Sequence, residues 1–157
     1  MLKQTILYQT LSNILNINPY QILFNILSDE GVQNYIEELN RNQLLDGENS
    51  LGVKLSDIGG EYSEVTLFLH PEKVRDRVNL YDTGEFHKSI QVNPQLNKGF
   101  EIQADPIKTN DNGTKTNLYG RWGEDIIGLQ DENLQSVIDK LLEQIKTQIL
   151  QQIQLNT

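Results

Sequence analysis

Apolar residues recur at helical spacing through the first 45 residues of the chain. Within Leu2–Ile17 they fall three or four residues apart, which is typical of an amphipathic helix. Asn18-Pro19 interrupts the pattern, and the proline is well placed to begin a second helix that ends near Leu27. A third stripe predicts a helix over residues 32–45. We therefore expect three consecutive helices at the N-terminus.

The middle of the chain alternates polar and apolar residues with a period of two, as half-buried strands do. Tyr62–Leu69 is predicted to be one such strand. Ile90–Val92 and Phe100–Ala104 are predicted to pair as a β-hairpin through the residues between them. Thr109–Asn117 is polar around Gly113, and we expect it to form an exposed loop.

The C-terminal part of the chain carries the longest apolar stripe. Asp131 and Glu132 favour a helix start, because acidic residues suit the positive end of a helix dipole. Burying six side chains of the stripe would stabilise the fold by roughly 9–18 kcal/mol before entropy costs. The helix must therefore be covered by its own core, by a neighbouring subunit, or by both. The stripe consists of Leu134, Ile138, Leu141, Leu142, Ile145, Ile149 and Ile153.

These elements predict an α+β fold, with helices at the N-terminus, a small antiparallel sheet with a β-hairpin, and a long C-terminal helix packed on the sheet. We expect residues 1–30 to form an apolar helical arm and residues 31–157 to form an α+β domain. The first 27 residues are too polar to span a membrane or to act as a secretion signal, because five amides interrupt them. These are Gln4, Gln9, Asn13, Asn16 and Asn18.

The most densely specified stretch of the sequence is Asn79–Ile90. Asp82 and Glu85 have the spacing of a capping box, and Tyr81 and Phe86 have that of a hydrophobic staple. A short helix started there needs tertiary contacts to persist. We interpret the stretch as a structural joint between this helix and the hairpin. Its members are Tyr81, Asp82, Thr83, Gly84, Glu85, Phe86, Ser89 and Ile90.

The chain offers little catalytic chemistry. Its net charge is −9, which argues against binding phosphate backbones through a basic surface, and it has no cysteine. His87 is near Glu85 and Ser89 in sequence, but residues two apart on a helix face different ways, so we interpret it as a surface residue. The loop 46–57 has calcium-site spacings, yet Leu51 stands where glycine is obligatory. We expect no catalytic residue, no metal and no cofactor.

Several short elements resemble a known class of viral protein. The stretch Leu80–Ile90 is similar to a pattern in the tail-completion and virion-morphogenesis proteins of tailed bacteriophages. Gln43-Leu44 before it, and Tyr119-Gly120, Ile127–Leu129 and a final helix after it, follow the order found in small structural proteins of phages that infect Bacteroidetes. The resemblance covers residues 35–150, and the first 30 residues have no counterpart in it.

The resemblance implies a non-enzymatic virion protein that is assembled in the bacterial cytoplasm. It would form a homo-oligomeric ring at the head–tail connector, neck or tail-completion position and would contact portal, neck or tail proteins. Genomic DNA would pass nearby without specific binding, and no membrane would be involved. The alternatives are a small acidic binding or inhibitor module and a small hydrolase that uses His87. The candidate assembly residues are Ile6, Leu11, Leu15, Leu23, Phe24, Arg121, Trp122, Leu141, Ile145, Ile149 and Ile153.

Overall fold

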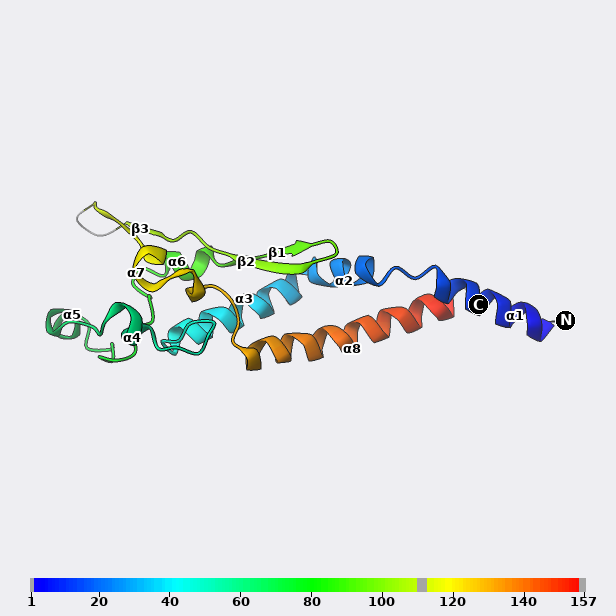
Figure 1. Ribbon diagram of the computed structural model, residues 1–157, viewed down its shortest axis with the longest axis horizontal. Helices are drawn as coiled ribbons and strands as arrows, with labels where there is room; N and C mark the ends of the chain where they lie inside the picture. The colour runs from blue at the N-terminus through cyan, green and yellow to red at the C-terminus, as the bar shows by residue number, and fades with distance from the viewer. Residues whose placement is uncertain (1, 110–112, 156–157) are drawn as a thin grey trace.

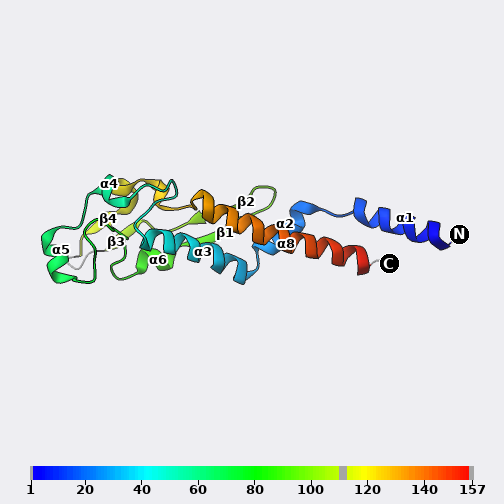
Figure 2. The same ribbon diagram turned by 90° about the horizontal axis from the view of Figure 1, so that it is seen from below.

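The protein is elongated, with both chain ends at the same end of the molecule (Figures 1 and 2). The computed structural model describes residues 2–109 and 113–155, and side chains within 9–109 and 113–154. Helix α1 (Leu2–Leu15) projects from the body at the end where the termini lie. The side chain of Ile6, a candidate assembly residue, falls outside the described part.

Three further helices run along the length of the body. They are α2 (Pro19–Leu27), α3 (Glu30–Leu45) and α8 (Asp131–Leu155). Pro19 begins α2 as predicted. Asn18 caps the helix, because its side chain accepts hydrogen bonds from the backbone amides of Tyr20 and Gln21. Asp29 caps α3 in the same way by accepting from the amide of Val32 at 3.1 Å. Helix α8 runs back along α2 and packs chiefly against it.

The strands form two small antiparallel sheets. β1 (Gln91–Gln95) pairs with β2 (Gly99–Gln103), and β3 (Ile107–Thr109) pairs with β4 (Lys115–Asn117). Short helices complete the far end of the body: α4 (Leu55–Gly59), α5 (Glu64–Leu69), α6 (Glu85–Ser89), α7 (Leu118–Trp122) and the 3₁₀ turn η1 (Glu124–Ile126).

The predicted α+β class is confirmed. The hairpin β1–β2 forms as expected, with Val92 opposite Ile102. The long C-terminal helix begins at Asp131, as expected, and its buried residues Val137 and Leu141 share a core with Val92. The N-terminal helices, the small sheets and the final helix therefore have the predicted arrangement.

The strand predicted over Tyr62–Leu69 is wrong, because this segment contains helix α5. Ser63 begins the helix by accepting a hydrogen bond from the amide of Thr66 at 3.2 Å. This local cap outweighs the alternation of apolar residues. All six residues of α5 remain at least partly exposed, so no sheet partner enforces the extended form.

The loop predicted over Thr109–Asn117 is also partly wrong, because its ends pair as β3 and β4. Lys108 lies opposite Thr116, and Thr109 lies opposite Lys115. Residues 110–112 lie outside the described part of the chain. Polar residues on both short strands concealed the pairing, since an alternating apolar pattern was missing.

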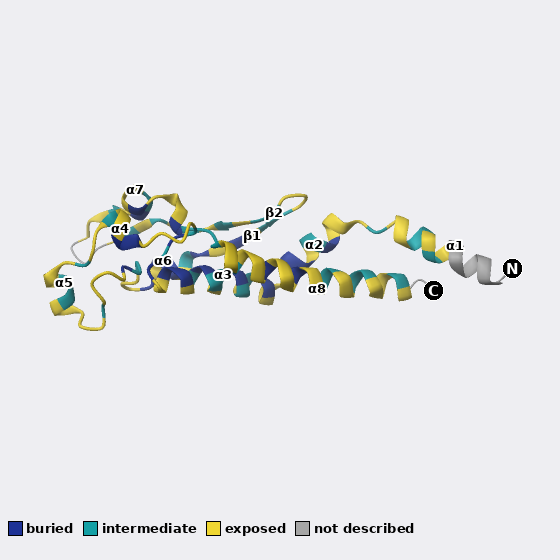
Figure 3. Cartoon of the chain, turned by 60° about the horizontal axis from the view of Figure 1, so that its bottom comes forward, coloured by how far each residue is buried: buried dark blue, intermediate teal, exposed yellow. Residues whose placement is uncertain are grey.

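Two apolar clusters make up the core, and α3 contributes to both. Cluster 1 joins α2, α3, β1 and α8, and cluster 2 joins the end of α3 to the short helices. Ile102 packs against both clusters. Because α2 buries three residues in cluster 1, it belongs to the body, and α1 alone forms the projecting arm (Figure 3). Cluster 1 consists of Ile22, Ile26, Leu27, Val32, Ile36, Val92, Val137 and Leu141; cluster 2 consists of Leu44, Leu55, Val78, Phe86, Ile90, Leu118, Trp122 and Ile126.

Buried amide side chains lie on α3 between the two clusters. Gln43 donates to the carbonyl of Gly128 at 3.2 Å and accepts from the backbone amide of Gln130 at 2.8 Å. Asn133 also donates to Gln43, at 3.2 Å. Asn40 accepts from the amide of Gly128 at 3.4 Å. These bonds hold the loop before α8 against α3.

Replacing Gln43 with methionine tests this network. Gln43→Met keeps the side-chain volume but leaves the amide of Gln130 and the carbonyl of Gly128 without their partner, which should cost about 2 kcal/mol of unfolding free energy. Urea denaturation measures the change. The matched control is Gln135→Met on the exposed side of α8, which should stay within about 0.5 kcal/mol of the unchanged protein. Equal effects of the two substitutions would contradict a structural role for the network.

Candidate functional site

The stretch that the sequence marks most strongly forms the joint between α6 and the hairpin, but its predicted cap is wrong. Helix α6 begins after Gly84, which occupies the N-cap position at φ +80°. The Asp82 carboxylate instead binds the ammonium of Lys108 on β3 at 2.5 Å. This hydrogen bond holds the pKa of Asp82 below its usual value. Asp82 therefore ties the joint to the second small sheet.

Gly84 is the residue of this stretch whose identity is fixed by its surroundings. Its positive φ disfavours any side chain, and a Cβ atom there would lie 3.0 Å from the hydroxyl of Tyr81. The ring of Tyr81 lies edge-on against the imidazole of His87, with 5.2 Å between the ring centroids. The ring of Phe86 also lies edge-on against the imidazole of His87, with 6.1 Å between the centroids. The two aromatic residues predicted to form a staple thus enclose His87 between them.

His87 is buried, which corrects the interpretation of this histidine as a surface residue. It is 4% exposed, and its Nε2 lies 2.8 Å from the carbonyl oxygen of Asn79, so Nε2 carries a proton that it donates. Burial lowers the pKa of His87, the bond to Asn79 opposes that change, and the charge of Arg41 adds to it. The neutral ring holds the loop before α6 in place.

Arg41 of α3 completes the joint, and sequence reasoning missed it. Its Nε donates to the carbonyl of His87 at 2.8 Å, and its Nη2 donates to the carbonyl of Ile90 at 2.9 Å. Glu37, one turn earlier, pairs with the same guanidinium and also accepts from the amide of Val92. The four-residue spacing of Glu37 and Arg41 is the signal that could have drawn attention to this pair. Ser89, another member of the stretch, accepts from the amide of Asp105.

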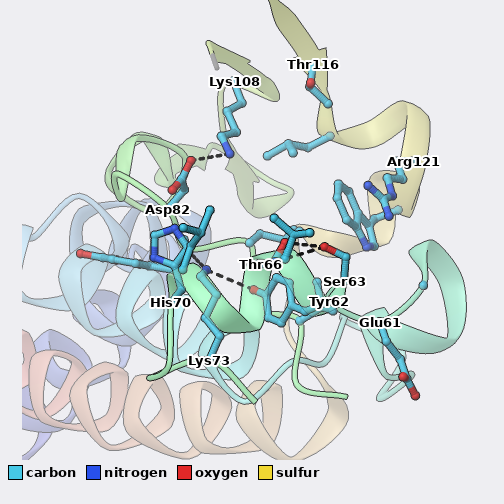
Figure 4. Close-up of a pocket in the computed structure, with 18 residues that line it drawn as sticks. Glu61, Tyr62, Ser63, Thr66, His70, Lys73, Asp82, Lys108, Thr116 and Arg121 are labelled. Carbon is cyan, nitrogen blue, oxygen red and sulfur yellow. Dashed lines mark hydrogen bonds and ion pairs between the residues drawn. The ribbon is translucent and has the colours of Figure 1, made fainter. Parts of the chain in front are cut away.

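A pocket of about 480 Å³ opens between α5, α7 and the joint (Figure 4). The cations that frame it are engaged by the chain itself. Lys73 donates to the carbonyl of Tyr81 at 2.6 Å, Lys108 pairs with Asp82, and Arg121 donates to the carbonyl of Gly59. These contacts give the lysines and the arginine of the pocket a structural role in joining the short helices.

Arg121 and Trp122, both candidate assembly residues, lock α7 onto α4. Trp122 is only 8% exposed and belongs to cluster 2, which leaves little of it for a partner. A Cβ atom on Gly59 would approach its indole nitrogen to 2.2 Å, so α4 can pack here only with glycine at that position. Arg121 stacks on the indole at 4.5 Å. Leu141 is likewise a core residue, at 8% exposure.

The remaining candidate assembly residues divide by exposure. Leu11 and Leu15 are exposed on α1, and together with Ile14 they form an apolar face that we call the arm stripe. The others are half-buried and, apart from Phe24 and Ile153, pack on cluster 1. They are Leu23, Phe24, Ile145, Ile149 and Ile153.

A second apolar face, on α5, was not expected from the sequence. Val65, Phe68 and Leu69 are 68%, 85% and 64% exposed and share one side of the helix, and we call them the α5 face. It lies at the end of the molecule opposite to α1 (Figures 1 and 3). The sequence did not reveal this face because Val65, Phe68 and Leu69 share one side only in a helix, and the segment was predicted to be a strand.

The described residues show neither a metal-binding cluster nor a membrane-spanning helix. Their His, Asp and Glu side chains form no group of three or more that could hold a metal ion. Within the same part of the chain, no helix has both the length and the apolar character that crossing a membrane requires. Comparison with known proteins gave no matching family model, curated protein or solved structure.

The buried His87 predicts a specific pH dependence of stability. The pKa of the folded form is below the ordinary value of 6.5, so the unfolded chain takes up a proton first as the pH falls. The contribution of neutral His87 is complete above pH 6.5 and is lost as the pH drops below it. Urea denaturation from about pH 7.5 to about pH 5.5 should therefore show a smaller loss of stability for His87→Gln than for the unchanged protein.

His70→Gln provides the matched control, because His70 is exposed and lies 3.4 Å from Glu72. It should leave the loss of stability over this pH range close to that of the unchanged protein. If His87→Gln and the unchanged protein lost stability equally, protonation of the buried ring would not be the cause.

Proposed function

We propose that this protein is a structural subunit of a tailed-bacteriophage virion. It forms a ring at the head–tail connector, neck or tail-completion position, joins portal to tail, and lets DNA pass. The subunit performs no chemistry, takes no cofactor and is assembled in the bacterial cytoplasm before it becomes part of the virion. The resemblance of residues 35–150 to phage structural proteins motivates the proposal.

The observation that carries the proposal is the pair of unlike apolar faces at opposite ends of the molecule. The arm stripe lies at one end and the α5 face at the other. A closed ring requires heterologous contacts, in which one surface of a copy meets a different surface of the next. A ring subunit in a connector must also contact a different protein above or below it. The arm stripe can supply one side of the ring contact, and the α5 face can meet the different protein.

Two elements of the resemblance also meet in space. Gln43 and the segment Ile127–Leu129 are far apart in sequence, and the side chain of Gln43 donates to the carbonyl of Gly128. The third element, Leu80–Ile90, is bound by Arg41, which precedes Gln43 on the same helix. The similar stretches are thus those that hold the body together, which supports a shared fold more than a shared catalytic site.

The proposal predicts a high-mass assembly that depends on the arm stripe. Light scattering during size-exclusion chromatography should give several times the 18.0 kDa of one chain. Leu15 is 83% exposed, so Leu15→Asp should disperse the assembly while the body keeps its helical circular dichroism, with a loss no larger than unwinding of the 14 residues of α1 would give. Gln9→Asp, on the opposite side of α1, is the control and should leave the assembly intact. A stable monomer at high concentration would contradict the ring and favour the acidic binding module instead.

The acidity of the chain predicts its behaviour toward DNA. Net charge −9 should let duplex DNA slide past without being held. Fluorescence anisotropy at low salt should therefore detect no saturable binding of a labelled duplex by the assembled protein. Tight binding that weakens steeply with added salt would contradict a passive passage, because it would reveal a basic surface on the assembly.

A further inference from the structure

The arm stripe lacks cover from the body of its own chain. Leu11, Ile14 and Leu15 are 51%, 45% and 83% exposed, although α1 touches the C-terminal part of α8. Figures 1 and 2 both show α1 continuing away from the body. The sequence around the stripe is also unusual, because residues 4–28 contain no charged side chain. The arm is therefore a helix without charge beyond Lys3 and with one exposed apolar side.

An apolar groove of about 400 Å³ lies at the other end of α8, beside the hairpin β1–β2, and we call it the hairpin groove. Leu134 of α8 forms one side of it, and Phe100 and Ile102 of β2 contribute as well. Ile138 and Leu142 follow Leu134 at four-residue spacing and are 39% and 57% exposed, so they extend the apolar surface along α8. The groove is lined by Lys98, Gly99, Phe100, Ile102, Ile127, Gly128, Leu129 and Leu134.

Charge limits what can occupy this groove. Copies of a chain with net charge −9 repel one another wherever their acidic surfaces approach. The arm and the groove are both suited to contact between copies. The arm is uncharged from residue 4 onward, and Lys98 is the one charged residue among the described residues that line the groove. Contact between them would bury apolar surface without bringing acidic side chains together.

The arm of the same chain cannot reach the groove. Helix α8 has 25 residues, which at about 1.5 Å per residue span roughly 37 Å. The arm lies by the C-terminal end of α8 (Figure 1), whereas the lining residue Leu134 places the groove at the start of that helix. An arm in the groove must therefore come from another copy.

We propose that α1 of one copy docks its arm stripe into the hairpin groove of the next copy. Each copy then gives an arm on one side and receives one on the other, which is the heterologous contact that closes a ring. The α5 face remains free for a different protein. This pairing rests on the proposed function, because it specifies how that ring is held together.

Engineered cysteines test the pairing, because the natural chain has none. The variant Leu15→Cys/Leu134→Cys places one thiol on the arm stripe and one in the groove. Within one copy, Leu15 lies by the C-terminal end of α8 and Leu134 lies near the start of that helix. A disulfide between the two cysteines must therefore join different copies. After mild oxidation of the assembled protein, non-reducing electrophoresis should show a ladder of covalent multimers.

Two matched controls displace one thiol at a time to the far side of its helix. Gln9→Cys/Leu134→Cys moves the arm thiol away from the stripe, and Leu15→Cys/Glu143→Cys moves the other thiol to the exposed back of α8. Both should give several-fold less ladder than Leu15→Cys/Leu134→Cys. Ladders of equal intensity in all three variants would reflect random collision and would overturn the pairing.

The remaining outcomes separate this pairing from the ring itself. A covalent dimer of the single variant Leu15→Cys, as abundant as the ladder, would show arms meeting arms and would overturn the pairing. An intact high-mass assembly without any ladder would overturn the pairing and leave the ring standing. A monomer in light scattering would overturn both.

Discussion

The arrangement of this molecule depends on buried amides that have to find partners. Asn40 and Gln43 lie on α3 between the two apolar clusters, where an amide without hydrogen bonds would cost several kcal/mol. Gly128 and Gln130, in the loop before α8, bond both groups of the Gln43 amide and the side-chain oxygen of Asn40, whereas Nδ2 of Asn40 has no hydrogen-bond partner among the described residues. Apolar packing alone would let α8 slide along α2, since Leu and Ile side chains fit many registers. The hydrogen bonds of the amides favour one register, in which α8 starts beside the end of α3 and next to the hairpin groove.

The same helix also fixes the joint at Leu80–Ile90. Arg41 reaches the carbonyls at the end of α6, and the buried ring of His87 binds the loop that leads into it. The most densely specified stretch of the sequence is therefore an attachment to α3. Its aromatic residues shield a neutral histidine, and Asp82 extends the attachment to the second sheet through Lys108. Such a joint ties α6 and the start of the hairpin to the end of α3.

Local signals explain which parts of this fold could be predicted from sequence. Helices α2, α3 and α8 and the hairpin have stripes, caps or turns within a few residues, and they lie where expected. Helix α5 was missed because the spacing of its apolar residues fits both a strand and a short helix. The hydrogen bond that the hydroxyl of Ser63 accepts at the start of α5 favours the helix. Asp82 was misjudged because its partner, Lys108, is distant in sequence. His87 was misjudged because the loop before α6 folds back onto its ring, which binds the carbonyl of Asn79 and contacts Tyr81. Spacing within a segment carries no information on such partners.

Helix stability gives an independent reason to expect the arm to be covered. An isolated helix of about 12–15 residues is marginal in water, and α1 has 14 residues with two threonines, a serine and an asparagine among them. Its exposed leucines add no stability until something apolar packs on them. Docking of the arm stripe in another copy would supply that contact, and the arm, whose one charged side chain is that of Lys3, would bring no acidic group toward an acidic neighbour. Assembly and ordering of α1 are then one event, so the concentration at which rings form should also be that at which the arm becomes helical.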